Sequence, residues 1–133
     1  MFSVPTRTQY GIRALVHLAT SEARSSTSAE IARAQTISPK YLEGILGQLK
    51  ASGLVLSERG AHGGYRLARG PEQILMREIV EALEGEVRPV GCVDDSDCCE
   101  QGVDCLPRRF WIGLKQAIDA YLDSKTLRDV IEA

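Results

Sequence analysis

Residues 38–68 read SPKYLEGILGQLKASGLVLSERGAHGGYRLA, and they predict a short helix followed by a β-hairpin. Ser38 is a good N-cap, and Pro39 stands at the first helical position, where its missing N–H costs nothing. Gly53 is expected to end the helix. The apolar residues recur at helical spacing and form a core stripe of Leu42, Ile45, Leu46 and Leu49. The remaining side chains of this helix are left on an outer face.

The hairpin follows directly, as two strand-like runs at 54–58 and 65–68 around a glycine-rich turn that carries cationic or ionisable residues. Two further helices are expected upstream. The first runs from about Thr6 to Glu22, and the second is short, with Ser28 as its N-cap. Three helices and a basic-tipped hairpin predict a winged helix-turn-helix, whose third helix enters the major groove of DNA.

The outer face of the third helix and the hairpin tip supply the candidate DNA contacts. Gln can read adenine, Glu can accept a hydrogen bond from cytosine, and Arg neutralises phosphates or enters a narrow minor groove. Gly44 and Gly47 each weaken the helix by about 1 kcal/mol, so they indicate close approach of another molecule or relief of packing against a neighbouring helix. The candidate residues are Ser38, Lys40, Tyr41, Glu43, Gln48, Arg59, His62, Gly63, Gly64 and Arg66.

The second half of the chain predicts three more helices. The fourth runs from about Ile74 to Glu84 and is stopped by Gly85. The fifth runs from Pro107 to about Leu122, and the last 8 residues form a short capped helix. Along the fifth helix, apolar residues recur near every 3.5 positions, which predicts a homodimer seam, with ordinary core packing as the alternative. The seam consists of Phe110, Leu114, Ala117 or Ile118, and Tyr121.

These elements divide the chain into a DNA-binding domain, residues 1–70, and a second part, residues 71–133, that holds the linker helix, the cysteine loop and the dimerisation helix. The expected fold class is mainly α with a small β-hairpin wing. The formal net charge is −2, but residues 1–77 carry ten basic and five acidic residues, and residues 78–133 carry six and thirteen. The basic part is expected to face a polyanion.

Several functional classes are excluded by what the sequence lacks. It contains no apolar run near the ~20 residues of a membrane span, and no secretory signal is visible, so a cytoplasmic protein is expected. Common nucleotide-binding, hydrolase and metalloprotease motifs are missing, so no enzymatic activity is predicted.

All four cysteines fall within residues 90–107, VGCVDDSDCCEQGVDCLP: Cys92, Cys98, Cys99 and Cys105. In a reducing compartment, clustered cysteines more often bind metal or sense redox state than form structural disulfides. Adjacent residues of an extended backbone point to opposite sides, so Cys98 and Cys99 are not expected to ligate one metal centre together unless a tight turn intervenes. The spacing does not favour zinc knuckles, and the acidic residues lack the register of a calcium loop.

Three segments of the chain resemble the IscR/NsrR/CymR superfamily of bacterial regulators, the Rrf-two family. They are TQYGIRALVHLA (8–19), SAEIARAQTISPKYLEGILGQLKASGLVLSERGAHGGYRLAR (28–69) and DCLPRRFWIGL (104–114). The resemblance implies a homodimeric winged-helix repressor or activator with a long crossing helix, which binds a palindromic operator. In the cluster-binding branch, three loop cysteines hold an iron–sulfur cluster, with [2Fe–2S] favoured over [4Fe–4S].

Carried onto this sequence, the resemblance makes Cys92 and Cys105 fixed ligands and one of Cys98 and Cys99 the third, with Cys99 favoured. The other member of the pair is either the fourth ligand or a spare exposed thiol. Two positions depart from the family pattern: Arg108 stands where one branch has a histidine ligand, and Gln9 stands where another has a carboxylate from the partner subunit.

Three functions remain open at this point. The favoured one is a DNA-binding regulator controlled by its cluster. The second is the same regulator without a cluster, sensing oxidants through its thiols or receiving the signal from a partner protein. The third is a small electron carrier or cluster-transfer protein, against which the basic third helix and wing count.

Overall fold

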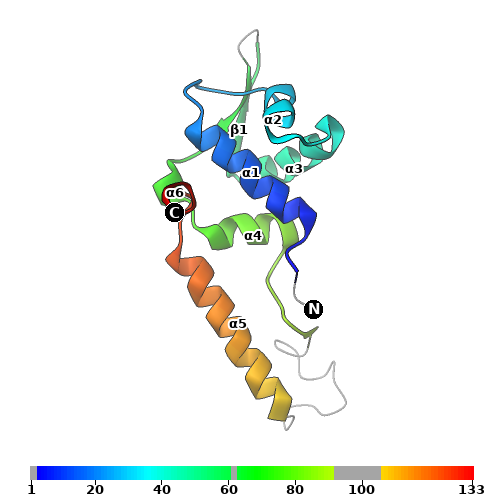
Figure 1. Cartoon of the computed structure of the whole chain (residues 1–133), viewed down its shortest axis with the longest axis vertical. Helices are drawn as coiled ribbons and strands as arrows, with labels where there is room; N and C mark the ends of the chain where they lie inside the picture. Colours follow the sequence, from blue (N-terminus) through cyan, green and yellow to red (C-terminus); the bar gives the residue numbers. More distant parts are fainter. Residues whose placement is uncertain (1–2, 61–62, 92–105) are drawn as a thin grey trace.

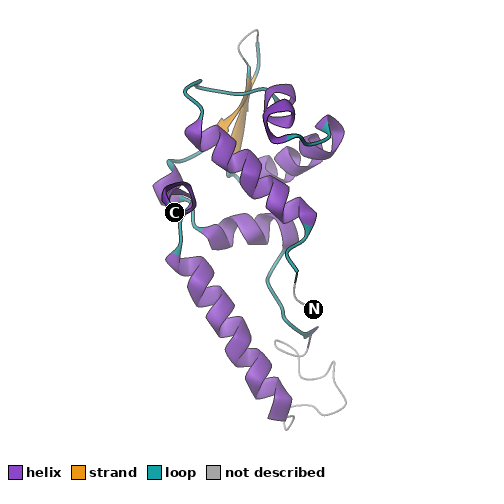
Figure 2. Ribbon diagram, viewed as in Figure 1, coloured by secondary structure: helices purple, strands orange, loops and turns teal. Residues whose placement is uncertain are grey.

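The computed structural model of the chain describes residues 3–60, 63–91 and 106–133, and it confirms a mainly helical fold with one two-stranded hairpin (Figures 1 and 2). In chain order the elements are α1 (Thr6–Thr20), α2 (Ser28–Gln35), α3 (Pro39–Ala51), β1 (Val55–Glu58), β2 (Gly64–Leu67), the 3₁₀ turn η1 (Pro71–Gln73), α4 (Met76–Glu84), α5 (Leu106–Ser124) and α6 (Leu127–Glu132).

Helix α3 is built as its sequence predicts. Ser38 Oγ accepts a hydrogen bond from the Tyr41 N–H at 3.5 Å, and Gly53 follows the helix with a φ of +78°. The four residues of its predicted core stripe are completely buried. Burial of one such side chain contributes about 1.5–3 kcal/mol, so this stripe fixes which face of α3 remains outside.

Helix α2 begins with a capping box, and its N-cap lies one residue earlier than the sequence predicted. Thr27, not Ser28, is the N-cap: its side chain accepts from the Glu30 N–H at 3.1 Å, and the Glu30 carboxylate accepts from the Thr27 N–H at 2.9 Å. Neighbouring Ser and Thr can both cap a helix, and the Glu three residues after Thr27 selects between them.

The hairpin pairs β1 and β2 antiparallel, with Val55 opposite Leu67 and Glu58 opposite Gly64. The α1–α2 loop is bonded to its outer edge: Ser26 and Tyr65 exchange backbone hydrogen bonds of 2.9 Å and 2.7 Å. This bridge holds the wing against the helical body, where the loop and hairpin lie together at one end of the molecule (Figure 1).

The second half of the chain returns to the same hydrophobic core. Helix α4 begins at Met76, two residues later than expected, because Ile74 and Met76 bond through their backbones to Leu127 and Lys125. Ile74, Ile79, Leu83 and Leu127 are buried together with residues of α1 and α3, so the core takes side chains from both sides of residue 70. The division of roles at residue 70 stays a prediction.

Helix α5 leaves this body as an arm that contacts α4 with its carboxyl-terminal half (Figure 1). Among the described residues, α5 contributes no apolar side chain to the fully buried core. Several of its large apolar side chains are exposed, namely Leu106, Phe110 and Tyr121. No helix in the described ranges is long and apolar enough to span a bilayer.

Candidate nucleic-acid interface and cysteine segment

The outer face of α3 is open. Ser38, Lys40, Tyr41 and Glu43 are exposed, as predicted from the helical spacing. A Cβ added at Gly44 or Gly47 would meet no atom within 4 Å, so these glycines do not relieve packing against another helix. Of the two explanations the sequence offered, approach of an external molecule is the one that fits this open face.

Gln48 differs from the other α3 candidates, because a side chain of α1 holds it. Gln48 is half-buried, and its Oε1 accepts a hydrogen bond from Arg7 Nε. Arg7 Nη2 also donates to the Gly44 carbonyl oxygen at 3.3 Å. Sequence reasoning missed Arg7, since no local pattern links residues that are 41 positions apart.

A second link between α1 and α3 is aromatic. The rings of Tyr10 and Tyr41 meet edge to face, with centroids 5.9 Å apart. The guanidinium of Arg13 lies 5.2 Å from the centroid of the Tyr10 ring and also donates to the backbone oxygen of Gln35 at the end of α2. Helix α1 thus braces one flank of the predicted reading face.

The wing carries a three-residue ion cluster. Arg66 Nε lies 2.6 Å from Glu58 Oε1, and Arg24, on the α1–α2 loop, reaches the same oxygen at 3.4 Å. Arg59 is exposed beside them, whereas the predicted contact His62 lies outside the described residues. Arg24 was not among the sequence candidates, because it enters this cluster only through the loop–wing bridge.

At both predicted wing glycines, Gly63 and Gly64, neighbouring backbone atoms leave no room for a side chain. A Cβ on Gly64 would lie 2.4 Å from the Ser26 carbonyl oxygen, and the φ of +142° is one that other residues rarely adopt. A Cβ on Gly63 would lie 2.4 Å from the Glu58 carbonyl oxygen. These glycines therefore permit the wing's close packing, and contact with DNA stays a prediction for both.

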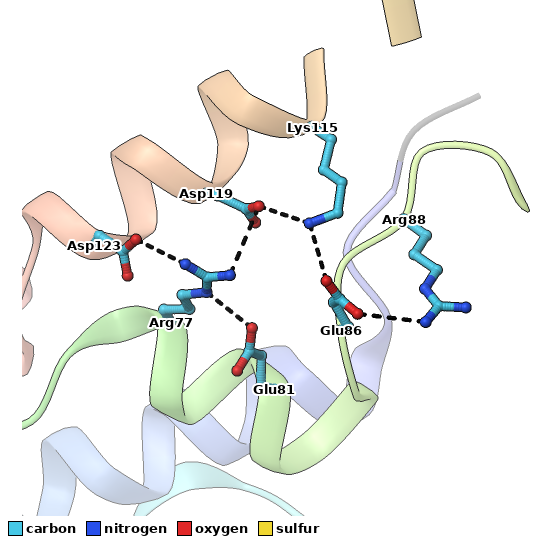
Figure 3. Close-up of polar contacts among 7 residues, drawn as sticks. All are labelled: Arg77, Glu81, Glu86, Arg88, Lys115, Asp119 and Asp123. Atoms are coloured by element: carbon cyan, nitrogen blue, oxygen red, sulfur yellow. Dashed lines mark hydrogen bonds and ion pairs between the residues drawn. The ribbon is translucent and has the colours of Figure 1, made fainter. Parts of the chain in front are cut away.

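A charged network joins α4, the segment after it and α5 (Figure 3). Lys115, buried on α5, lies 2.7 Å from Asp119 and 3.1 Å from Glu86, which precedes Cys92 by six residues. On α4, Arg77 pairs with Glu81, Asp123 and Asp119 at 2.9, 2.8 and 3.7 Å.

The ion pairs of this network shift the pKa values of their members. The hydrogen bond to Asp119, together with the bond to Glu86, raises the pKa of Lys115. The hydrogen bond from Lys115, together with that from Arg88, lowers the pKa of Glu86. Each partner therefore keeps the other charged at neutral pH.

Cys92, Cys98, Cys99 and Cys105 fall outside the described residues, so their predicted ligation is judged by donor chemistry. Four thiols within 14 residues supply the soft donors that iron–sulfur clusters use. Arg108, on the first turn of α5, is a cation and cannot ligate a metal. Gln9 lies on α1, where its Nε2 donates to the Val4 carbonyl oxygen at 2.8 Å. Within the described ranges, no group of three or more His, Cys, Asp and Glu could hold a metal.

Residues 4–133 match the Rrf2 family model, described as an iron-dependent transcriptional regulator. The chain is 38% identical over 127 residues to protein rrf2 of Nitratidesulfovibrio vulgaris, covering 95% of this chain and 85% of that protein.

Two solved structures are similar over nearly the whole chain. CymR, the global cysteine regulator of B. subtilis, is 33% identical with a TM-score of 0.82, over 99% of this chain and 98% of CymR. IscR of T. potens is 32% identical with a TM-score of 0.78, over 98% of this chain and 87% of IscR.

Proposed function

Because this chain belongs to the Rrf2 (Rrf-two) family of transcriptional regulators, we propose that it is a homodimeric regulator whose operator binding is controlled by an iron–sulfur cluster. Its winged-helix fold and its relatives make it a DNA-binding transcription regulator and not an enzyme. In the proposal, the protein is cytoplasmic and binds a palindromic operator in double-stranded DNA. Helix α3 reads the bases, and the wing lies along the DNA phosphate backbone.

The open outer face of α3 is the observation that carries DNA binding. It presents Lys40, Tyr41 and Glu43 around two glycines whose missing side chains leave room for a close approach. Arg59 and Arg66 place cations on the wing, and Arg24 adds one on the α1–α2 loop that is bonded to the wing. Polar side chains on the helix can bond to base edges, and the nearby arginines can contact phosphates.

The cysteine segment is proposed to hold the cluster, since its thiolates match the donor chemistry and the family description names iron. Cys92 and Cys105 are the fixed ligands, and one of Cys98 and Cys99 is the third, with Cys99 favoured. The other member of the pair is either the fourth ligand, in place of the histidine that is absent at Arg108, or a spare thiol. Bound there, an iron–sulfur cluster supplies a group that is sensitive to iron supply and oxidants. The [2Fe–2S] type is favoured.

Anaerobic purification tests this proposal. The protein is expected to be coloured, with iron and sulfide in equal amounts, and to shift an operator fragment in a salt-dependent way. Cys92→Ala and Cys105→Ala should each abolish the visible absorption, and a single change at Cys98 or Cys99 should reduce it only in part. A full-strength spectrum in Cys92→Ala would show that the ligand assignment is wrong.

A second candidate function is favoured by the similarity to CymR, which is as high as that to IscR. In this alternative the same DNA-binding protein holds no cluster, and its thiols sense oxidants directly or a partner protein supplies the signal. Colourless anaerobic protein whose operator affinity changes on mild oxidation would support this alternative and contradict the cluster.

A further inference from the structure

A hydrogen bond from Arg7, on α1, fixes the orientation of the Gln48 side-chain amide. Arg7 Nε donates to Gln48, and Arg7 Nη2 donates to the Gly44 carbonyl oxygen at 3.3 Å. A guanidinium has N–H donors and no acceptor, so the Gln48 atom that faces it must be the amide oxygen. The amide nitrogen, with two N–H donors, then points away from Arg7 Nε.

That nitrogen is available to a ligand. Arg7 is the only hydrogen-bond partner of the Gln48 side chain within the described ranges. In the same part of the chain, no buried side-chain nitrogen or oxygen lacks a partner. The nitrogen of half-buried Gln48 therefore reaches solvent, on a helix whose neighbouring positions Gly44 and Gly47 leave open space.

We infer that Arg7 is a positioning residue that makes Gln48 a donor-only reader, selective for guanine. The inference rests on the proposed function, in which α3 lies in the major groove. A free Gln reads adenine by accepting from N6 and donating to N7, which uses both ends of its amide. Arg7 holds the amide oxygen toward α1 and occupies one of its two lone pairs, so Gln48 turns its N–H donors, and not its oxygen, to the base. Guanine matches them with two acceptors, O6 and N7, whereas adenine presents its own N6 donor.

Two simpler roles for Arg7 predict different results. If Arg7 only braced α1 against α3, its loss would weaken binding to all operators alike. If Arg7 contacted a phosphate, its loss would flatten the salt dependence of binding by about one unit for every sequence. A positioning role instead changes which base is preferred and leaves the salt dependence as it was.

The test selects operators from a randomised palindromic library with anaerobically purified full-length protein. The variants are Gln48→Leu, Arg7→Ala, Glu43→Ala and Arg13→Ala. Arg13→Ala is the control, because it removes another arginine of α1. Arg13 is anchored on α2 and the Tyr10 ring and makes no hydrogen bond to α3. Affinities for selected operators are then measured at several salt concentrations, and thermal unfolding checks that each variant folds.

We expect one base position per half-site to lose its preference in Gln48→Leu. The wild type should favour guanine over adenine there by about tenfold. Arg7→Ala should remove or reverse this preference with an unchanged salt dependence, and Arg13→Ala should keep it.

Other outcomes overturn the inference. Adenine preferred by the wild type, an unaltered preference in Arg7→Ala, or a flattened salt dependence in that variant each contradicts the positioning role. If Gln48→Leu changes no position while Glu43→Ala does, this inference fails and the proposed function stands. If the wild type selects no common sequence, the proposed function fails with it.

Discussion

Single glycines of the wing show how one Cβ atom decides whether a substitution is tolerated. Gly60 and Gly64 both have positive φ values, of +111° and +142°. A Cβ at Gly60 would lie in open space, whereas one at Gly64 would overlap the backbone of the loop that bridges to the wing. Backbone strain acts at both positions, and steric overlap acts at one.

Gly64→Ala should therefore lower the free energy of unfolding by about 3 kcal/mol, against about 1 kcal/mol for Gly60→Ala. Urea denaturation of the two variants measures the difference. Because the overlap pushes the wing away from the α1–α2 loop at Ser26, operator affinity should also fall more in Gly64→Ala. Equal unfolding midpoints would contradict the close approach of loop and wing.

Arg59 is expected to contact DNA phosphates, and Glu43 is expected to contact bases. Arg59→Ala should weaken binding to all sequences alike and flatten the salt dependence by about one unit, since it removes one phosphate contact. Glu43→Ala should instead change which sequences bind, because it removes an acceptor on the reading face. Fluorescence anisotropy with operator and scrambled DNA separates the two, and a uniform loss in Glu43→Ala would exclude it as a reader.

Ion pairs from Arg77 join helices α4 and α5. Arg77→Met removes three ion-pair partners of the guanidinium at once. We expect faster amide exchange along α5 and a lower Tm, with the buried core intact. Arg128→Met is the matched control, because Arg128 pairs with Glu72 and Glu132 away from α5. Identical α5 exchange in the two variants would contradict this role of Arg77.

Acid should weaken the ion pair between Glu86, which follows α4, and Lys115 of α5. The hydrogen bond from Lys115 lowers the pKa of Glu86 below its ordinary 4.5. The unfolded chain therefore binds more protons than the folded chain as the pH falls. The contribution of Glu86 to stability is complete above about pH 5.5 and is lost as the pH drops through 4.5 towards the folded value. Glu86→Gln should show a shallower loss of Tm between pH 6 and 3 than the wild type; an equally steep loss would exclude Glu86.

The elements whose ends are set by local chemistry could be predicted from the sequence. Ser38, Pro39 and the apolar stripe define α3, and Gly85 stops α4 with a φ of +79°. The start of α4 could not be predicted, since it depends on backbone bonds to residues about 50 positions later. The same holds for the site: the outer face of α3 follows from periodicity, whereas the Arg7–Gln48 contact requires two helices to be packed.

At the scale of the whole molecule, α5 presents an apolar face with two largely exposed aromatic side chains. Phe110 is 68% exposed and Tyr121 64% exposed, on the side of the helix away from Lys115 and Asp119. Leu114 and Ile118 lie between them, half-buried. We propose that this seam pairs two copies, which also places two α3 helices for a palindromic operator.

Leu114→Glu combined with Ile118→Glu should give monomers of 14.5 kDa by light scattering and reduce operator affinity about a hundredfold. The control adds the same charges on another face of α5, as Gln116→Glu with Ala120→Glu, both exposed positions. That variant should remain dimeric. A dimeric Leu114→Glu, Ile118→Glu protein would place the interface elsewhere.

The arm, described at residues 85–91 and 106–126, leaves the body after α4 and rejoins it where Lys125 and Leu127 bond to Met76 and Ile74, at the other end of the same helix. Helix α4 has nine residues, so the two points of attachment are about 14 Å apart, a gap that about five extended residues can span. The arm therefore begins and ends close together on the body, so a change in its length need not move α4 relative to α6.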